Sequence, residues 1–293
     1  MKKIIVWSVI FLFATGCIAT SNKKSGGLTA AGDTDEIRKE YYPTGELFSE
    51  MTYVDGIKDG ISKAYYKNGN ISAEGNIKNG NLEGLGKAYY ENGKIKEEIN
   101  YVNDKREGLA KIYYKNGQLQ LEGNIKNGKW EGLIKDYYPS GKLKVKRNYL
   151  NGKEEGFKKV YHENGNLQGE VNFINGKMEG TGKFYYESGN LNSVDNYKND
   201  KSEGISKTFY ENGQLKFELN FKNNKVEGIS KTFYENGQLK FELNYKNDKL
   251  EGISNTYYEN GEYRYIDIYK NDKKINRKAF SEEGQLKFDQ NYQ

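Results

Sequence analysis

The sequence predicts an all-β fold, an elongated single-layer twisted antiparallel β-meander built from eleven hairpin units of about 24 residues. A turn glycine recurs every 24 residues from Gly45 to Gly261, and the last one, Gly284, follows after 23. Two neighbouring units, residues 203–226 and 227–250, are identical at 21 of 24 positions. The chain also has 34 Gly, 26 Tyr and 13 Phe but only 2 Pro, which is typical of many short strands and tight turns.

The first segment, residues 1–16, has the layout of a secretory signal peptide. Two lysines precede an apolar run and then small residues, and the run is too short for a comfortable transmembrane helix. The sequence ATGC resembles a bacterial lipobox, which implies that Cys17 is the lipid attachment site and the mature N-terminus. Residues 17–36 are then the lipidated Cys and a flexible Ser/Gly/Ala-rich tether. We expect an exported, membrane-anchored lipoprotein at the outer membrane or cell surface, because Asp is absent after the Cys.

Residues 37–293 form the repeat domain, in which each unit reads as two strands and two turns. One turn has the sequence ENG, as at Asn236-Gly237, and the other has Asn-Gly or Asn-Asp, as at Asn247-Asp248. Both are predicted to be two-residue type I′ loops, because Gly, Asn and Asp tolerate positive φ. Strands joined by such loops are antiparallel neighbours, so the chain is expected to be a meander of about 22 strands.

Two-residue loops also predict the register of the sheet. One face is expected to carry Tyr234, Leu239 and Phe241, and the other Phe233 and Lys240. A lysine then meets a glutamate directly across the strands in six units: Lys63–Glu74, Lys87–Glu98, Lys111–Glu122, Lys159–Glu170, Lys207–Glu218 and Lys231–Glu242. In two others the partner is not acidic: Lys135 meets Lys146, and Lys183 meets Val194. Opposite charges across strands contribute about 0.2–1 kcal/mol, so the lysine column is interpreted as sheet-stabilising and not as a phosphate site.

Each unit has two adjacent aromatic residues before its turn glycine, which predicts one aromatic column on each face. Most of these rings are expected to form the core, and the part left exposed is expected to bind a partner. The candidate binding surface comprises Tyr66, Tyr90, Tyr114, Tyr138, His162, Tyr186, Tyr210 and Tyr234 of the second column, with Trp130 from a turn. Specificity is expected where the repeat pattern breaks: at Trp130, His162, Lys146 and Asp195.

The unit EGxxKxYYENGxLKxExxYKNGKxEG resembles the bacterial variant of the MORN repeat, over all eleven units. The paired aromatic residues before ENG, the Leu or Ile two places after the Gly, and the NGKxEG turn carry this resemblance. Similar chains are called YwqK-type, after the antitoxin half of a toxin–antitoxin pair. The resemblance implies an extended twisted β-sheet that contacts a partner protein, or sometimes a membrane, and it implies no catalysis.

The residues themselves also indicate a protein that is not an enzyme. Cys17 is the only cysteine and His162 the only histidine, so no thiolate cluster and no histidine metal site are expected. There is no Gly-rich phosphate loop, and the glutamates occupy equivalent repeated places, whereas a general acid/base pair needs two unlike environments. We expect no catalytic residue, no cofactor and no metal. A nucleic-acid partner is not expected either, because the lysines pair with glutamates and the chain is exported.

Three binding functions follow from these observations. The first is an envelope-anchored scaffold or surface module that binds another protein. The second is an antitoxin or immunity protein that neutralises a secreted toxin, and the third is a module that binds envelope glycan or a membrane surface. The sequence leaves open the partner, the binding face, and whether edge strands near Tyr41 and Asn291 pair with another chain.

Overall fold

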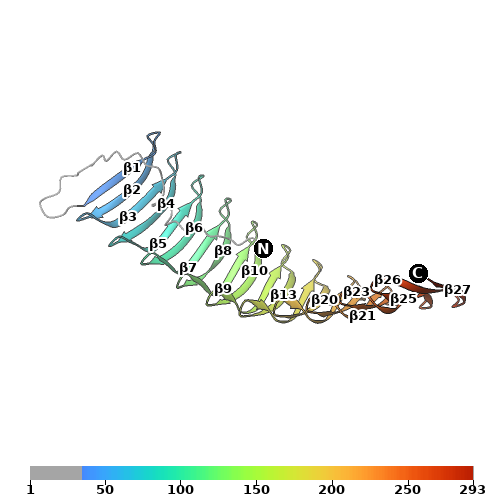
Figure 1. Cartoon of the computed structure of the whole chain (residues 1–293). Helices are drawn as coiled ribbons and strands as arrows, with labels where there is room; N and C mark the ends of the chain where they lie inside the picture. Colours follow the sequence, from blue (N-terminus) through green and yellow to red (C-terminus); the bar gives the residue numbers. More distant parts are fainter. Residues whose placement is uncertain (1–34, 293) are drawn as a thin grey trace. The chain divides into compact units, whose positions relative to one another are not determined.

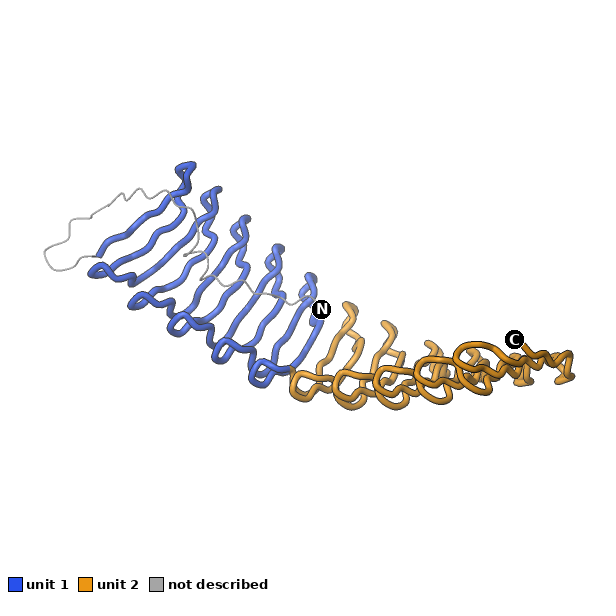
Figure 2. The backbone as a smooth tube through the Cα atoms, viewed as in Figure 1, with its two compact units in different colours: residues 1–153 blue, residues 154–293 orange. Residues whose placement is uncertain are grey.

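The computed structural model describes residues 35–292, and these residues contain 27 strands of one antiparallel sheet and no helix (Figure 1). This confirms the predicted all-β meander. The predicted signal peptide, Cys17 and most of the predicted tether lie outside the described residues. The chain divides into two compact units, residues 1–153 and residues 154–293, which are coloured separately in Figure 2.

Unit 1 consists of strands of six to nine residues, each paired antiparallel with the next along the chain. They are β1 (Glu36–Tyr41), β2 (Leu47–Val54), β3 (Ile57–Tyr65), β4 (Ile71–Lys78), β5 (Asn81–Tyr89), β6 (Ile95–Val102), β7 (Lys105–Tyr113), β8 (Leu119–Lys126), β9 (Lys129–Tyr137) and β10 (Leu143–Leu150).

Unit 2 continues the meander with several shorter strands, and β11 (Lys153–Glu154) lies at the boundary. The strands are β12 (Gly156–Tyr161), β13 (Leu167–Ile174), β14 (Lys177–Met178), β15 (Gly180–Tyr185), β16 (Leu191–Lys198), β17 (Lys201–Ser202), β18 (Gly204–Phe209), β19 (Leu215–Lys222), β20 (Lys225–Val226), β21 (Gly228–Phe233), β22 (Leu239–Lys246), β23 (Lys249–Leu250), β24 (Gly252–Tyr257), β25 (Tyr263–Lys270), β26 (Lys273–Phe280) and β27 (Leu286–Asn291).

A Glu-Gly bulge explains why 27 strands are present where about 22 were predicted. Between β20 and β21, the Glu227 N–H donates to the Asn220 carbonyl (2.9 Å), and Gly228 has a φ of 78°. Five of the predicted strands are divided at this place, between β11 and β12, β14 and β15, β17 and β18, β20 and β21, and β23 and β24. The recurring Gly of the EG motif is therefore required by the positive φ of a bulge.

The Asn-Gly and Asn-Asp turns have the predicted type I′ geometry. Asn247 and Asp248 both have positive φ, 51° and 67°, and Lys246 pairs with Lys249 across them. Their side chains also hold neighbouring repeats, because Asp248 Oδ1 accepts the Val226 N–H at 2.7 Å. This part of the turn prediction is confirmed.

The prediction of a two-residue type I′ loop at ENG is wrong. The Tyr234 carbonyl accepts the Gly237 N–H (2.9 Å), and the Tyr234 N–H donates to the Gln238 carbonyl (2.8 Å), so three residues form the loop. Gly237 has a φ of 87°, whereas Asn236 is not among the residues with positive φ. The Asn236 Oδ1 accepts the Gln238 N–H at 2.9 Å, which favours a type I turn followed by a glycine bulge over type I′.

The lysine–glutamate register is confirmed in spite of that error, because a second bulge compensates for the longer loop. Phe233 pairs with Leu239, and then Thr232 pairs with Phe241, so that Lys240 is the extra residue. All six predicted Lys–Glu pairs are opposite each other, as are the two exceptions.

The two faces of the sheet differ in their packing. The packed face carries the buried side chains; in unit 1 its core cluster is Ile77, Leu82, Ile99, Tyr101, Ala110 and Ile125. The opposite face, here called the Lys/Glu face, carries the charged pairs and the first aromatic column. Two predicted placements are wrong. Leu239 was expected on the same face as Tyr234, but it pairs with Phe233 of the Lys/Glu face. Lys240 was expected on the same face as Phe233, but its ammonium lies over Tyr234 and Phe241 on the packed face.

Candidate binding surfaces

The predicted binding tyrosines of the second column are bonded from one repeat to the next. In six of them the hydroxyl donates to the backbone carbonyl 23 residues later. The bonds run from Tyr66 to Tyr89 O (2.8 Å), Tyr90 to Tyr113 O (2.7 Å), Tyr114 to Tyr137 O (2.8 Å), Tyr186 to Phe209 O (2.7 Å), Tyr210 to Phe233 O (2.9 Å) and Tyr234 to Tyr257 O (3.0 Å). Burial raises the pKa of Tyr66, Tyr90, Tyr114 and Tyr234, which keeps these phenols protonated as donors.

His162 replaces a tyrosine of this column and keeps its contact. Its Nε2 lies 3.2 Å from the Tyr185 carbonyl oxygen, which can only accept, so Nε2 carries the hydrogen. Its Nδ1 lies 3.9 Å from Glu187 Oε1. The Lys144 ammonium lies 5.1 Å from the centre of the Tyr138 ring. These side chains therefore serve as inter-repeat contacts, with half-buried rings.

Trp130, the other predicted binding residue, packs against the core. It was predicted in a turn but lies in β9, opposite Ile125 of β8, and is a partly buried neighbour of the core cluster of unit 1. The larger indole replaces the Leu, Arg, Met or Val of other repeats without leaving the packed face. Its position is explained by packing.

The glutamates of the Lys/Glu face are hydrogen-bond hubs. Glu122 accepts from the Tyr137 hydroxyl (2.7 Å) and from the Lys135 ammonium (3.1 Å). The hydrogen bond from Tyr137 is the largest cause that holds the pKa of Glu122 below its ordinary value, and the hydrogen bond from Lys135 adds to it. Burial and the same hydrogen bond raise the pKa of Tyr137 to about 12. The polar residues of this motif thus bond to each other within the sheet.

The glutamate of each EG motif is used in the same way. The Glu227 carboxylate accepts the Asn247 N–H of the next type I′ turn at 2.8 Å. The same bond forms in other repeats, including Glu107 to Asn127 (2.8 Å) and Glu179 to Asn199 (2.9 Å). A carboxylate that accepts a backbone N–H in the folded state is held in place as part of the scaffold.

A further repeated feature is a column of exposed apolar side chains on the Lys/Glu face, which form no hydrogen bonds within the scaffold. They directly follow the bulge glycine of the EG motif and are 44–60% exposed. The members are Ile61, Leu85, Leu109 and Leu133 in unit 1 and Phe157, Ile205, Ile229 and Ile253 in unit 2. In the paired strand an asparagine lies opposite seven of them, as Asn244 does opposite Ile229. We call this set the apolar column.

Sequence reasoning missed the apolar column, although a signal for it was present. The residue after the EG glycine is apolar in eight repeats and is Thr181 in another. In a scaffold with a solvent-facing surface, a β-branched or aliphatic residue at a fixed exposed place is informative because it recurs.

Within residues 35–292, no group of His, Cys, Asp and Glu could hold a metal ion. The same residues include no helix that is long and apolar enough to span a membrane.

The stacked hairpins and the bonds between repeats define a β-hairpin repeat protein. The family model described as MORN repeat variant matches ten segments: residues 37–55, 58–79, 82–103, 106–127, 130–151, 155–175, 178–199, 202–223, 226–247 and 250–271. The chain belongs to this family, which confirms the predicted resemblance to the MORN repeat. The eleventh predicted repeat lies outside the match. Its loop still has the hydrogen bond of the ENG loops, in which the Gly284 N–H donates to the Ser281 carbonyl (3.0 Å).

Other comparisons add little. No curated protein matches the chain. Among solved structures, a chain of a mutant Photorhabdus luminescens Tc holotoxin pore is 13% identical, with 88% of this chain and 17% of that chain covered. The TM-score is 0.20, so this similarity carries no argument about fold or function.

Proposed function

We propose that this protein is a non-catalytic binding module that holds another protein against the part of the apolar column in unit 2, on the Lys/Glu face. The observation that carries the proposal is the exposure of eight apolar side chains at one repeated place. Contiguous exposed apolar surface rimmed by polar residues is typical of protein–protein contact sites. The repeat spacing, twice the distance of about 4.8 Å between strands, suits an extended partner surface.

The charges beside the column favour a protein over a membrane or a polyanion. Lys207 and Lys231 are paired with Glu218 (3.2 Å) and Glu242 (4.0 Å). Alternating paired charges leave little net positive potential to attract anionic lipids or phosphates. A polar rim of Lys, Glu and Asn around apolar side chains matches an ordinary protein interface. A secreted toxin, as the antitoxin alternative requires, would be a partner of this kind.

Crosslinking in intact cells tests the proposal. The variant Ile205→Thr, Ile229→Thr and Ile253→Thr keeps β-branched side chains and removes apolar surface from the column. Its matched control carries Val102→Thr, Leu150→Thr and Ile174→Thr, which are 46%, 52% and 47% exposed but lie beside type I′ turns. The column variant is expected to lose a crosslinked protein that the wild type and the control variant both capture. Equal capture by all three proteins would reject the apolar column as the binding site.

We further propose that a lipid at Cys17 anchors the module in the cell envelope, which the N-terminal sequence alone supports. The variant Cys17→Ala is expected to move the protein from the membrane fraction to the soluble fraction. A protein that remains equally membrane-bound after this change would rule out the lipid anchor. Because the apolar column is far from Cys17 in sequence, the two tests are independent.

A further inference from the structure

Three consecutive repeats of unit 2 place a cation between two aromatic rings on the packed face. The Lys216 ammonium lies 5.1 Å from the Tyr210 ring centre and 5.4 Å from that of Phe217. Lys240 lies 5.0 Å from Tyr234 and 5.6 Å from Phe241, and the Arg264 guanidinium carbon lies 5.5 Å from Tyr258 and 5.3 Å from Tyr265. We call these nine residues the cation–aromatic strip.

The strip is a local addition to the scaffold. Where unit 2 has Phe217, Phe241 and Tyr265, the first repeats of unit 1 have Ser49 and Ala73 at the equivalent places, both buried. The hairpins of unit 1 form the same pairs without these rings. The rings are therefore not required for strand pairing, so a role in binding is open to them.

The positive charges of the three cations are available to an anionic ligand. Among the ion pairs of residues 35–292, none involves Lys216, Lys240 or Arg264. The buried acid nearby is neutralised separately, since Asp267 accepts two hydrogen bonds from Arg277, at 2.7 and 2.8 Å. Each free cation is held over two rings by cation–π attraction, so its head group is positioned before any ligand arrives.

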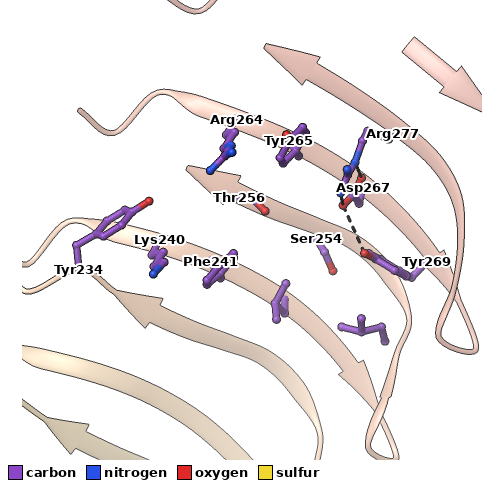
Figure 3. Close-up of a pocket in the computed structure, with 12 residues that line it drawn as sticks. Tyr234, Lys240, Phe241, Ser254, Thr256, Arg264, Tyr265, Asp267, Tyr269 and Arg277 are labelled. Atoms are coloured by element: carbon purple, nitrogen blue, oxygen red, sulfur yellow. Dashed lines mark hydrogen bonds and ion pairs between the residues drawn. The ribbon is translucent and has the colours of Figure 1, made fainter. Parts of the chain in front are cut away.

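A groove lies beside two of the three cations, Lys240 and Arg264. It has a volume of about 470 Å³ and is lined by Tyr234, Lys240, Phe241, Thr256, Arg264 and Tyr265, among others. Figure 3 shows Lys240 and Phe241 on β22 and Arg264 and Tyr265 on β25, with Ser254 and Thr256 of β24 between them. Rings, hydroxyl groups and spaced cations are thus combined in one shallow groove.

We propose that the cation–aromatic strip binds an acidic polysaccharide, a chain with one carboxylate for every two sugars. Sugar rings stack their C–H faces on aromatic side chains, their hydroxyl groups suit Ser and Thr, and their carboxylates suit Lys and Arg. Equivalent cations lie two strands apart, about 9.6 Å along the sheet. The disaccharide repeat of an extended linear polysaccharide has a similar length, so each carboxylate meets one cation.

Other polyanions fit this spacing less well. Acidic residues on one side of an extended peptide recur every two residues, about 6.8 Å apart. Phosphates of a nucleic-acid strand are also more closely spaced along the axis, about 3.4 Å in a duplex. Both would place charges between the cations, against the rings. The strip lies on the face opposite the apolar column, so this proposal is independent of the proposed protein partner.

The test measures binding of hyaluronan oligosaccharides, which carry one carboxylate per disaccharide, to the purified chain by titration calorimetry. Two variants remove the two chemical features separately: Lys216→Gln, Lys240→Gln and Arg264→Gln remove charge, and Phe217→Ser, Phe241→Ser and Tyr265→Ser remove rings. The matched control, Lys78→Gln, Lys126→Gln and Lys198→Gln, removes the same charge from exposed places beside the type I′ turns. Circular dichroism checks that every variant keeps its strands.

Both strip variants are expected to weaken hyaluronan binding by about tenfold or more, and the control is expected to bind as the wild type does. Three results would overturn the proposal. They are wild-type protein that does not bind hyaluronan, a control that loses as much affinity as the strip variants, and oligothymidylate or polyglutamate bound more tightly than hyaluronan.

Discussion

His162 is the single histidine of the chain, and its ring makes the contact that a phenol makes in other repeats. An Nε2–H and a tyrosine O–H are both donors at the end of a flat ring, so either can reach the carbonyl 23 residues later. A residue that is rare in composition thus has a common role in the scaffold. At this scale each side chain is explained by the atom that it contacts in the next repeat.

The variant His162→Ala is therefore expected to lower the free energy of unfolding by about 1 kcal/mol, because the Tyr185 carbonyl loses its donor. His162→Tyr restores the contact of the other repeats and is expected to keep wild-type stability or exceed it. Urea denaturation followed by circular dichroism measures both. If the alanine and tyrosine variants were equally stable, the proposed hydrogen bond would contribute nothing.

The first aromatic column makes a pH prediction. Burial, followed by a hydrogen bond to a glutamate, raises the pKa of Tyr65, Tyr113 and Tyr137 to about 12. In the unfolded chain the pKa of tyrosine is about 10. The raised pKa favours the neutral phenol in the folded state, so the stability is fully present below pH of about 10 and is lost as the pH rises towards about 12.

Phenolate absorbance during an alkaline titration measures this effect. A fraction of the tyrosines is expected to ionise late in the folded protein and at the ordinary pKa in urea. The variant Tyr65→Phe, Tyr113→Phe and Tyr137→Phe should lose part of the late fraction. Titration of all tyrosines near pH of about 10 in the folded protein would contradict the buried hydrogen bonds.

At the scale of the element, a large side chain of one strand can fill the space beside a glycine of the next strand on the packed face. A Cβ added at Gly123 in β8 would lie 2.1 Å from the Cδ1 of Ile134 in β9, and Ile134 is 1% exposed. In the β8–β9 pair, the large side chain of Ile134 thus packs over Gly123, which has no side chain of its own. Such pairs explain how a single layer with few aliphatic residues still buries its interior.

Gly123→Ala is expected to lower the free energy of unfolding by about 1–3 kcal/mol, because the new methyl overpacks Ile134. Ile134→Val removes the Cδ1 methyl, so adding Gly123→Ala to that variant should cost less than adding it to the wild type. A double-mutant cycle from urea denaturation gives the difference. Equal costs in both backgrounds would show that the two residues do not meet.

At the scale of the whole molecule, each repeat is joined to its neighbours by the same set of bonds. The tyrosine hydroxyl, the EG glutamate and the turn Asp or Asn all bond from one repeat to the next. In such a protein stability is approximately a sum of repeat terms and nearest-neighbour terms. Whole repeats are therefore interchangeable, whereas half repeats are not.

Deletion of residues 227–250 joins Val226 to Glu251 and reproduces the junction between Leu250 and Glu251. The shortened chain is expected to fold with the same strand signal per residue and somewhat lower stability. Deletion of residues 227–238 removes one strand and joins unlike segments, so this variant is expected to aggregate or unfold locally. Circular dichroism and gel filtration compare the two. Equal behaviour would reject the repeat as the unit of folding.

Most of the fold was predictable because its determinants are local and recur every 24 residues. The Asn-Gly and Asn-Asp dipeptides predicted type I′ turns, and the Lys–Glu pairs predicted the register. The ENG loop was not predictable in the same way, because the Asn236 side chain bonds to the backbone and selects a different turn. Of the candidate surfaces, the tyrosine column was recognised but the apolar column was not, because the exposure of a side chain depends on the strands paired beside it.

The sequence by itself determined that this protein is a β-hairpin repeat, because periodic turn residues and alternating side chains admit one strand order. Only the tertiary structure decided which polar side chains bond within the scaffold and which apolar side chains stay exposed. Hydrogen bonds between residues 20 to 23 positions apart engage the tyrosine and glutamate side chains of the motif. The bulge at Lys240 turns a cation onto the rings of the packed face, and the bulge at Gly228 precedes an isoleucine that faces solvent. Bulges and distant acceptors depend on the paired strand, which the local sequence does not contain.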